Sequence, residues 1–300
     1  MDAILTLIAA PDKANLDGPT VGRVVSALTD QGARGVTPPD WLAKGIACDI
    51  SFSGLPPATA KSLVIQAING QPVDAVVQPR AHRRKRLLVA DMDSTMITGE
   101  TVDELAARAG VRRKVARITA RTMQGELDFT DSLRARVALL AGLDEAALTD
   151  VRDHALTEMP GARALVATMR ANGAYTALVS GGFTWFTEAV AAHIGFDAHQ
   201  GNRLEIVDGA LTGQLHEPVI NRGGKRRALK AIAKERDIAL AESLAVGDGA
   251  NDLDMLADAG LGVAFRAKPL VAASAPARID HGDLTALLYL QGYRKSEFVD

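Results

Sequence analysis

The chain has 300 residues, 47% of them hydrophobic, which suffices for a sizeable core and fits two domains better than one. Its 34 basic and 36 acidic residues give a net charge of −2, so the molecule has no overall field that would attract nucleic acid or an anionic membrane. A single cysteine, Cys48, excludes an intramolecular disulfide. No apolar run approaches the ~18 residues of a membrane span and the first residues carry no basic leader, so we expect a cytoplasmic protein without a membrane partner.

The first 80 residues alternate strand-like and helix-like segments. Three segments have the apolar pattern of strands: residues 3–9, 46–52 and 73–77. Two segments have a helical pattern: one carrying Val21, Val24, Val25 and Leu28, and one after Pro57 carrying Leu63, Ile65 and Ile68. A further strand is poorly marked because Pro38 and Pro39 interrupt it. This order predicts a small βαββαβ sandwich over residues 1–80.

A basic run at residues 80–86 (RAHRRKR) follows this first part. Such a run can form a nucleic-acid patch, but it contains no interleaved aromatic residue and the chain is weakly acidic. We therefore interpret it as a solvated linker to a second domain, residues 81–300, and expect no nucleic-acid partner.

From Leu87 onward the strands are separated by longer helices, a rhythm typical of βαβ units and a parallel sheet. The predicted strands are residues 87–90, 176–179, 244–246 and 262–265. Polar clusters follow the first three: residues 91–95 (DMDST), 180–182 (SGG) and 247–252 (GDGAND). Because ligands gather at the carboxyl ends of strands in an open parallel sheet, these clusters are expected to converge on one site.

Two insertions interrupt this pattern. Residues from about 98 to 158 contain no convincing strand and several helical segments separated by glycines, which predicts a helical cap over the mouth of the sheet. Residues 202–215 carry apolar residues on both sides of Asp208-Gly209, a strong signal for a hairpin that could form a flap beside the same mouth.

The first polar cluster contains Asp91 and Asp93, which leave the end of an apolar strand. Residues two apart in a strand point the same way, so both carboxylates can face one phosphate. One carboxylate can then attack phosphorus while the other exchanges a proton with the leaving oxygen and with water. Taken alone, the same spacing also suits a calcium loop or a capped turn.

The other clusters supply complementary groups. Asp248 and Asp252 offer the hard oxygen ligands that Mg²⁺ prefers, although Asp252 also suits a helix cap. Ser180, before two glycines, can bind phosphate through its hydroxyl and nearby N–H groups, or can simply form a turn. Lys225 at a helix start can provide a positive charge, or can be one of several surface cations there.

Taken together and in this order, these clusters resemble the haloacid dehalogenase-like (HAD) phosphatases, whose DxDST, Ser, Lys and GDGxND pattern is present across residues 87 to about 280. The resemblance implies an α/β fold with a Rossmann-like parallel-sheet core and a small helical cap inserted after the first motif. It implies that Asp91 is the nucleophile and Asp93 the general acid/base. It also implies phosphate binding by Ser180, Gly181, Lys225 and Asn251, and a Mg²⁺ site formed by Asp91, the backbone carbonyl of Asp93, Asp248 and Asp252.

The cap contains two charged residues suited to a zwitterionic substrate. Glu100 lies at the cap entrance, where a carboxylate can pair with an ammonium group. Arg136 borders the apolar stripe of Leu133, Val137 and Leu140, where a guanidinium can hold a carboxylate, while Arg134 points elsewhere. The alternatives are a helix N-terminal charge for Glu100 and a surface residue for Arg136.

Within the HAD phosphatases, the segments MDSTMITGETVDELA, DFTDSLRARV and VSGGF resemble the phosphoserine phosphatases. This resemblance implies that Glu100 binds the substrate ammonium, that Arg136 binds its carboxylate, and that Met123 and Phe129 shape the pocket. It implies hydrolysis of O-phospho-L-serine in the last step of serine biosynthesis. The element order of residues 1–80 resembles an ACT-like regulatory domain. Two alternatives stay open: a phosphatase or phosphotransferase acting on a related phospho-amino acid, such as phosphothreonine or phosphohomoserine, and an amino-acid sensor with secondary phosphatase activity. The first domain could also form a homodimer.

Overall fold

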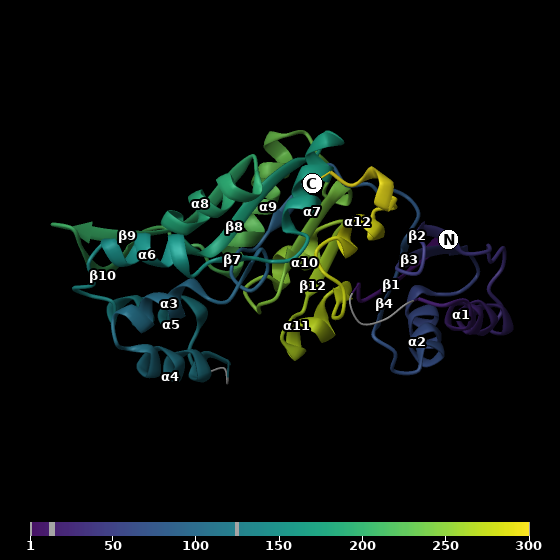
Figure 1. The fold of residues 1–300 in the computed structure, drawn as a ribbon, viewed down its shortest axis with the longest axis horizontal. Helices are drawn as coiled ribbons and strands as arrows, with labels where there is room; N and C mark the ends of the chain where they lie inside the picture. The colour runs from purple at the N-terminus through teal and green to yellow at the C-terminus, as the bar shows by residue number, and fades with distance from the viewer. Residues whose placement is uncertain (1, 12–15, 124–125, 300) are drawn as a thin grey trace.

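The computed structural model describes residues 2–11, 16–123 and 126–299, which form two principal sheets of unequal size (Figure 1). The smaller sheet has the strand order β2-β3-β1-β4 and belongs to residues 2–79, here called the N-terminal unit. The larger sheet has the order β10-β9-β8-β5-β11-β12-β13. Helices cover both of its faces, and a group of helices projects beyond one end (Figure 1).

The N-terminal unit has the predicted βαββαβ order. Its elements are β1 (Ala3–Ala9), α1 (Gly18–Asp30), β2 (Asp40–Ala43), β3 (Ala47–Phe52), α2 (Pro57–Ile68) and β4 (Val73–Pro79). The poorly marked second strand begins directly after Pro38 and Pro39, at the edge of the antiparallel sheet, where a missing N–H donor disturbs no ladder. Helix α2 buries Ala60, Val64 and Ile68, while Ile65 is 48% exposed.

Both faces of the small sheet are covered. Leu5 and Leu7 of β1 pack in one hydrophobic cluster with α1 and α2. Ile8 on the opposite face of β1 packs in the main core of the chain, together with Leu290 and Tyr293 near the carboxyl end. Successive side chains of a strand point to opposite faces, which explains why neighbouring residues of β1 lie in different clusters. The face that carries Ile8 therefore packs the N-terminal unit against the core of the larger sheet.

The basic run at residues 80–86 is solvated only in part: five of its seven residues are exposed, as the sequence suggested, but Arg83 is partly buried and Lys85 is buried. Arg83 lies 2.6 Å from Asp49 of β3 and donates hydrogen bonds to the carbonyls of Tyr289 and Leu290. Lys85 is also buried, and its Nζ donates to the carbonyl of Ala241. Arg83 therefore links the N-terminal unit to the segment at residues 289–290, and Lys85 anchors the run beside the larger sheet.

The larger sheet is mostly parallel, as the strand–helix rhythm predicted. Its strands are β5 (Leu87–Ala90), β8 (Tyr175–Phe183), β9 (Ala198–Val207), β10 (Ala210–His216), β11 (Ser243–Gly247), β12 (Leu261–Phe265) and β13 (Ala277–Ile279). Only the β9–β10 pair among these is antiparallel in the described residues. Its turn places Asp208 at φ 51° and Gly209 at φ 77°, which confirms the predicted hairpin.

Helices sandwich this sheet in two layers. Leu87 and Val89 of β5 pack with one layer, and Leu88 and Ala90 pack with the other, as expected for a strand buried on both faces. The first layer contains α9 (Arg222–Glu235), α10 (Leu253–Asp258) and α11 (Pro269–Ser274); the second contains α7 (Ala162–Ala171), α8 (Thr184–Ile194) and α12 (Ala286–Leu290). Among the described residues, no helix has the length and apolar character to cross a membrane.

A helical cap lies between two short strands, β6 (Ile97–Thr98) and β7 (Thr157–Glu158), which pair with each other. Its helices are α3 (Thr101–Arg108), α4 (Arg112–Met123), α5 (Phe129–Ala138) and α6 (Ala146–His154). Helix α5 packs against β10, and the backbone of Leu211 in β10 exchanges hydrogen bonds with Gly142 and Leu143. The hairpin therefore supports the cap beside the carboxyl end of β8 (Figure 1).

Replacing Arg83 by alanine is expected to lower the free energy of unfolding by roughly 3 kcal/mol, because it leaves the buried Asp49 carboxylate without its partner. The matched control is Arg84→Ala, since Arg84 pairs with Glu297 at the surface and its loss is expected to cost about 1 kcal/mol or less. Urea-induced unfolding of both variants measures the difference. Equal losses for the two variants would contradict the buried role of Arg83.

Candidate active site

The predicted polar clusters meet at the carboxyl edge of the larger sheet. Strands β8, β5 and β11 are adjacent there; Asp91 follows β5, and Asp248 follows β11. The strand predicted at 176–179 continues to Phe183, so Ser180 and the two glycines lie within β8 rather than in a turn after it. The register with β9 shifts between Val179 and Phe183, which shows an irregularity at the Ser-Gly-Gly segment.

Lys225 lies at the centre of this site and is fully buried. Its Nζ is 2.6 Å from Oδ1 of Asp91 and 2.6 Å from Oδ1 of Asp252. Burial opposes the charged ammonium, but the two carboxylates outweigh it and raise the pKa of Lys225. Asn221 caps α9 by accepting from the N–H of Gly224, which fixes the helix start that carries Lys225.

Three carboxylates surround this lysine. Ligand oxygens of Asp91, Asp248 and Asp252 all lie within 4.8 Å of one another, and all three residues are buried. Burial, followed by the charge of Asp91, raises the pKa of Asp248 to about 6 and that of Asp252 to about 7. A compact set of hard oxygen donors with incompletely balanced negative charge fits a divalent cation such as Mg²⁺.

Asp93 occupies a different environment from Asp91. Its Oδ1 accepts a hydrogen bond of 2.8 Å from the backbone N–H of Thr101 at the start of the cap. Burial, followed by the negative charge of Glu100, raises the pKa of Asp93 well above its usual value. The raised pKa favours the protonated form of Asp93, which is the form that a general acid needs.

Gly182 provides the space that Asp93 occupies. A Cβ at this position would lie 2.7 Å from Oδ2 of Asp93 and 3.1 Å from Oγ of Ser180. The Gly182 N–H also donates to Oγ of Ser180 over 2.9 Å, so the serine hydroxyl remains oriented within the site. The glycine therefore permits a close approach between the strand end and the two polar side chains.

The cap supplies Glu100 and Arg136. Ser94, at φ 55°, donates from its hydroxyl to Oε1 of Glu100 over 2.9 Å. Burial raises the pKa of Glu100, opposed by the charge of Lys268, whereas burial lowers the pKa of Arg136, opposed by the charge of Glu100. The two side chains thus interact electrostatically across the cap entrance.

The helical pattern around Arg136 is as predicted. The stripe of Leu133, Val137 and Leu140 is buried, whereas Arg134 is an exposed residue paired with Glu217. Arg136 has no such ion pair among the described residues, and its Nε donates to the carbonyl of Ser132. Its guanidinium therefore retains donors for a ligand.

The first residue of α5 brings the cap against the core. A Cβ on Gly181 would lie 2.9 Å from Cζ of Phe129 and 3.7 Å from Nδ2 of Asn251, so these three predicted residues are neighbours. Met123 ends α4, but its side chain lies outside the described part of the structure.

Two further residues belong to the site although no motif indicated them. Asn202 of β9 is buried, donates to the carbonyl of Gly181 and accepts from the N–H of Ile220, which ties the hairpin to the site. Lys268 lies 3.7 Å from Oδ2 of Asp248. It follows the fourth predicted strand as the other clusters follow theirs, so the strand-end rule could have identified it; the sequence around Asn202 carried no comparable signal.

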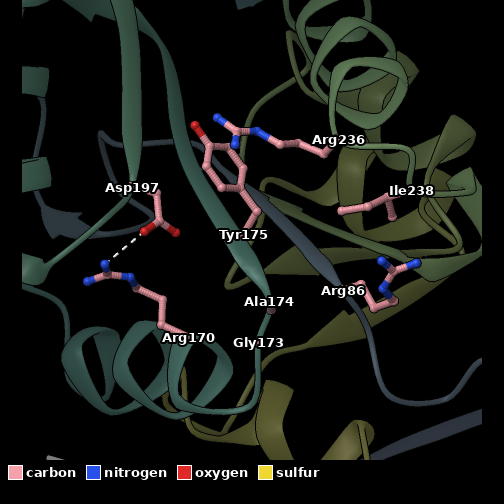
Figure 2. Close-up of a pocket in the computed structure, with 8 residues that line it drawn as sticks. All are labelled: Arg86, Arg170, Gly173, Ala174, Tyr175, Asp197, Arg236 and Ile238. Atoms are coloured by element: carbon pink, nitrogen blue, oxygen red, sulfur yellow. Dashed lines mark ion pairs between the residues drawn. The ribbon is translucent and has the colours of Figure 1, made fainter.

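A separate cavity of about 390 Å³ lies at the opposite end of the strands (Figure 2). Tyr175, the first residue of β8, forms part of its lining. Arg236 stacks over the Tyr175 ring at 3.8 Å, and Arg170 pairs with Asp197 at 2.8 Å. None of the predicted site residues lines this cavity.

Comparison with known proteins agrees with this geometry. Residues 88–257 match the family of haloacid dehalogenase-like hydrolases. A phosphoserine phosphatase of Streptomyces coelicolor is 48% identical over 224 residues, covering 74% of this chain and 54% of that protein. The chain thus spans about half the length of that curated relative.

Solved structures extend the similarity to the N-terminal unit. A HAD family hydrolase from Salmonella enterica serovar Typhi superposes with a TM-score of 0.82 at 29% identity, covering 96% of this chain and 98% of that one. A probable phosphoserine phosphatase from Vibrio cholerae superposes with a TM-score of 0.76 at 32% identity, covering 98% and 88%. The chain belongs to the haloacid dehalogenase-like hydrolases, which confirms the predicted α/β fold class.

The stability of the metal-free protein is expected to fall as the pH rises from about 4 to about 7. When the pKa of an acid is higher in the folded than in the unfolded protein, the free energy of unfolding falls as the pH rises between the two pKa values. For Asp248 alone this decrease is roughly 3 kcal/mol. Thermal unfolding with a chelator measures this decline, and millimolar Mg²⁺ is expected to restore stability at pH 8.

The Asp248→Asn variant is the control for this titration. It removes one ionisable carboxylate and is expected to give a flatter pH dependence and a smaller response to Mg²⁺. A metal-free wild-type protein whose stability rises across the same interval would contradict the assignment.

Proposed function

We propose that the chain is a phosphoserine phosphatase that uses Mg²⁺ to hydrolyse O-phospho-L-serine to L-serine and phosphate, the last step of serine biosynthesis. The observation that carries the proposal is the pairing of two half-sites: the Lys225 carboxylate cluster on the core, and Glu100 with Arg136 on the cap. The first suits a phosphate group, and the second suits an ammonium and a carboxylate. The similarity to proteins described as phosphoserine phosphatases supports the same substrate.

In the first proposed step, a carboxylate oxygen of Asp91 attacks phosphorus. The bond between phosphorus and the serine oxygen breaks, and Asp93 delivers its proton to that oxygen, so L-serine leaves as a neutral alcohol. Lys225 lies 2.6 Å from Asp91 and would balance negative charge on the phosphoryl group together with the Ser180 hydroxyl and the amide of Asn251.

In the second step, water replaces the aspartate. The ionised Asp93 accepts a proton from water, the water oxygen attacks phosphorus, and the bond to Asp91 breaks to release phosphate and restore the carboxylate. Asp91, Asp248 and Asp252, with the backbone carbonyl of Asp93, would hold Mg²⁺, which would lower the charge repulsion between enzyme and phosphate ester when bound.

The cap residues would select the leaving group. Glu100 would accept hydrogen bonds from the substrate ammonium, and Arg136 would donate to its carboxylate. Phe129, against Gly181, would help to exclude water from the bond that breaks. Phosphothreonine and phosphohomoserine carry the same charged groups, so phosphoserine is preferred among them because the similar proteins are described as phosphoserine phosphatases.

An Asp91→Asn variant is expected to lose turnover on every phosphate ester, because an amide is a poor nucleophile. Phosphate release is measured with Mg²⁺ on phosphoserine, phosphothreonine, phosphoethanolamine and phosphoglycolate. Wild-type activity should be highest on phosphoserine, since only the amino acids offer both charged groups. A wild-type rate on phosphoglycolate equal to that on phosphoserine would reject the proposed substrate.

An Arg136→Ala variant is expected to lower kcat/KM for phosphoserine about 10- to 100-fold, because a charge-assisted contact to the carboxylate is lost. Its kcat/KM for phosphoethanolamine, which lacks a carboxylate, should change little. Arg134→Ala is the matched control on the same helix, since that side chain pairs with Glu217 at the surface. If Arg134→Ala and Arg136→Ala behave alike on both esters, the role assigned to Arg136 is wrong.

A further inference from the structure

Asp74 of the N-terminal unit is embedded in a loop of the hydrolase core. It lies on β4, is 4% exposed, and its carboxylate accepts from three consecutive backbone N–H groups. The donors and closest distances are Asp280 at 2.8 Å, His281 at 3.2 Å and Gly282 at 2.8 Å. Because an anion held by three N–H groups fixes their relative orientation, Asp74 orders this loop after β13.

The loop after β13 also contacts Arg266, which directly follows β12. The carbonyl of Gly282 accepts from Nε of Arg266 at 3.2 Å and from its Nη2 at 3.0 Å. The backbone N–H of Arg266 donates to the carbonyl of Ile279 over 2.7 Å. Arg266 has φ 43°, a backbone conformation that residues other than glycine rarely adopt. The contacts just described therefore hold a strained backbone in place.

Two residues later the chain reaches the active site at Lys268. Its backbone N–H donates to the carbonyl of Asp248 over 3.3 Å, and its Nζ lies 3.7 Å from Oδ2 of the same residue. Its charge also acts on Glu100 across the cap entrance. The Lys268 side chain is 47% exposed, so its ammonium lies at the solvent side of a site rich in carboxylates.

We propose that the N-terminal unit positions Lys268 at the mouth of the active site through Asp74 and Arg266, and that Lys268 helps to hold the anionic phosphate ester there. The inference rests on the proposed phosphatase function and adds residues to that site. An ester with two negative charges must approach a cluster of carboxylates, so a cation fixed at the rim lowers the cost of its approach. Asp74 and Arg266 are positioning residues because they act through Lys268.

The N-terminal unit makes a second buried contact that provides a control. Asp49 pairs with Arg83 and accepts from the hydroxyl of Thr6, and in the described structure it makes no hydrogen bond or ion pair with the loops at 266–268 or 280–282. Asp49→Asn should therefore reduce stability without changing substrate binding. A purely structural role for Asp74 would give Asp74→Asn the same behaviour.

The test is a double-mutant cycle on the full chain with saturating Mg²⁺. Asp74→Asn and Lys268→Met are each expected to raise KM for phosphoserine about two- to tenfold with little change in kcat. The double variant should have the same KM as Lys268→Met alone, because both substitutions remove the same contribution of Lys268 to substrate binding. Lys268→Arg should retain a KM near that of the wild type.

Hydrogen exchange provides a readout that does not depend on activity. Peptides covering residues 262–270 should exchange faster in Asp74→Asn than in the wild type, and should not do so in Asp49→Asn. If Asp74→Asn does not fold, Arg266→Met interrupts the same contacts one step later and should give the same rise in KM.

The outcomes separate this inference from the proposed function. A wild-type protein without phosphoserine turnover would reject the function, whereas the exchange comparison would still test the connection between Asp74 and the loop. With an active wild type, an unchanged KM in Asp74→Asn, or effects of Asp74→Asn and Lys268→Met that multiply in the double variant, would overturn the inference.

Discussion

The buried ammonium of Lys225 is the interaction on which the rest of the site depends. Three carboxylates with oxygens within 4.8 Å repel one another, and at this depth each unit of charge is costly to leave unbalanced. Lys225 lies 2.6 Å from Asp91 and 2.6 Å from Asp252, so its ammonium balances part of the negative charge of the cluster, and the charge that is left favours a divalent cation. A lysine in this position offsets the cost of burying the carboxylate that we propose as the nucleophile.

The fold explains how these groups reach one point. The carboxyl ends of β5, β8 and β11 lie side by side, and α9 begins close enough for Lys225 to extend between the aspartates. The cap then adds groups that the sheet cannot provide, with Phe129 against Gly181 and with Glu100 held by Ser94. Chemistry on the sheet and selectivity on the cap are thus separate contributions to one proposed reaction, and the N-terminal unit contacts the same edge through Asp74.

Local sequence patterns predicted the features that depend on short-range burial and turn geometry. The strand at 87–90, the hairpin at Asp208-Gly209 and the stripe beside Arg136 were predicted because burial and turn geometry leave a short-range signal. The contacts of Arg83 were not predictable, because its partners are Asp49 in another strand and the backbone carbonyls of residues 289 and 290, which lie more than 200 positions further along the chain. The place of Asn202 in the site also depends on tertiary contacts, which a one-dimensional pattern does not contain, whereas Lys268 follows a predicted strand and could have been found by the strand-end rule.

The most direct measurement of the central claim is detection of a phosphorylated enzyme. Wild-type protein is mixed with radiolabelled phosphoserine and Mg²⁺, quenched in acid during turnover, and digested for peptide mapping. The account predicts a hydroxylamine-sensitive label on the peptide that contains Asp91, and no label in Asp91→Asn. A label on another residue, or continued turnover by the Asp91→Asn protein, would contradict the assignment of Asp91 as the nucleophile.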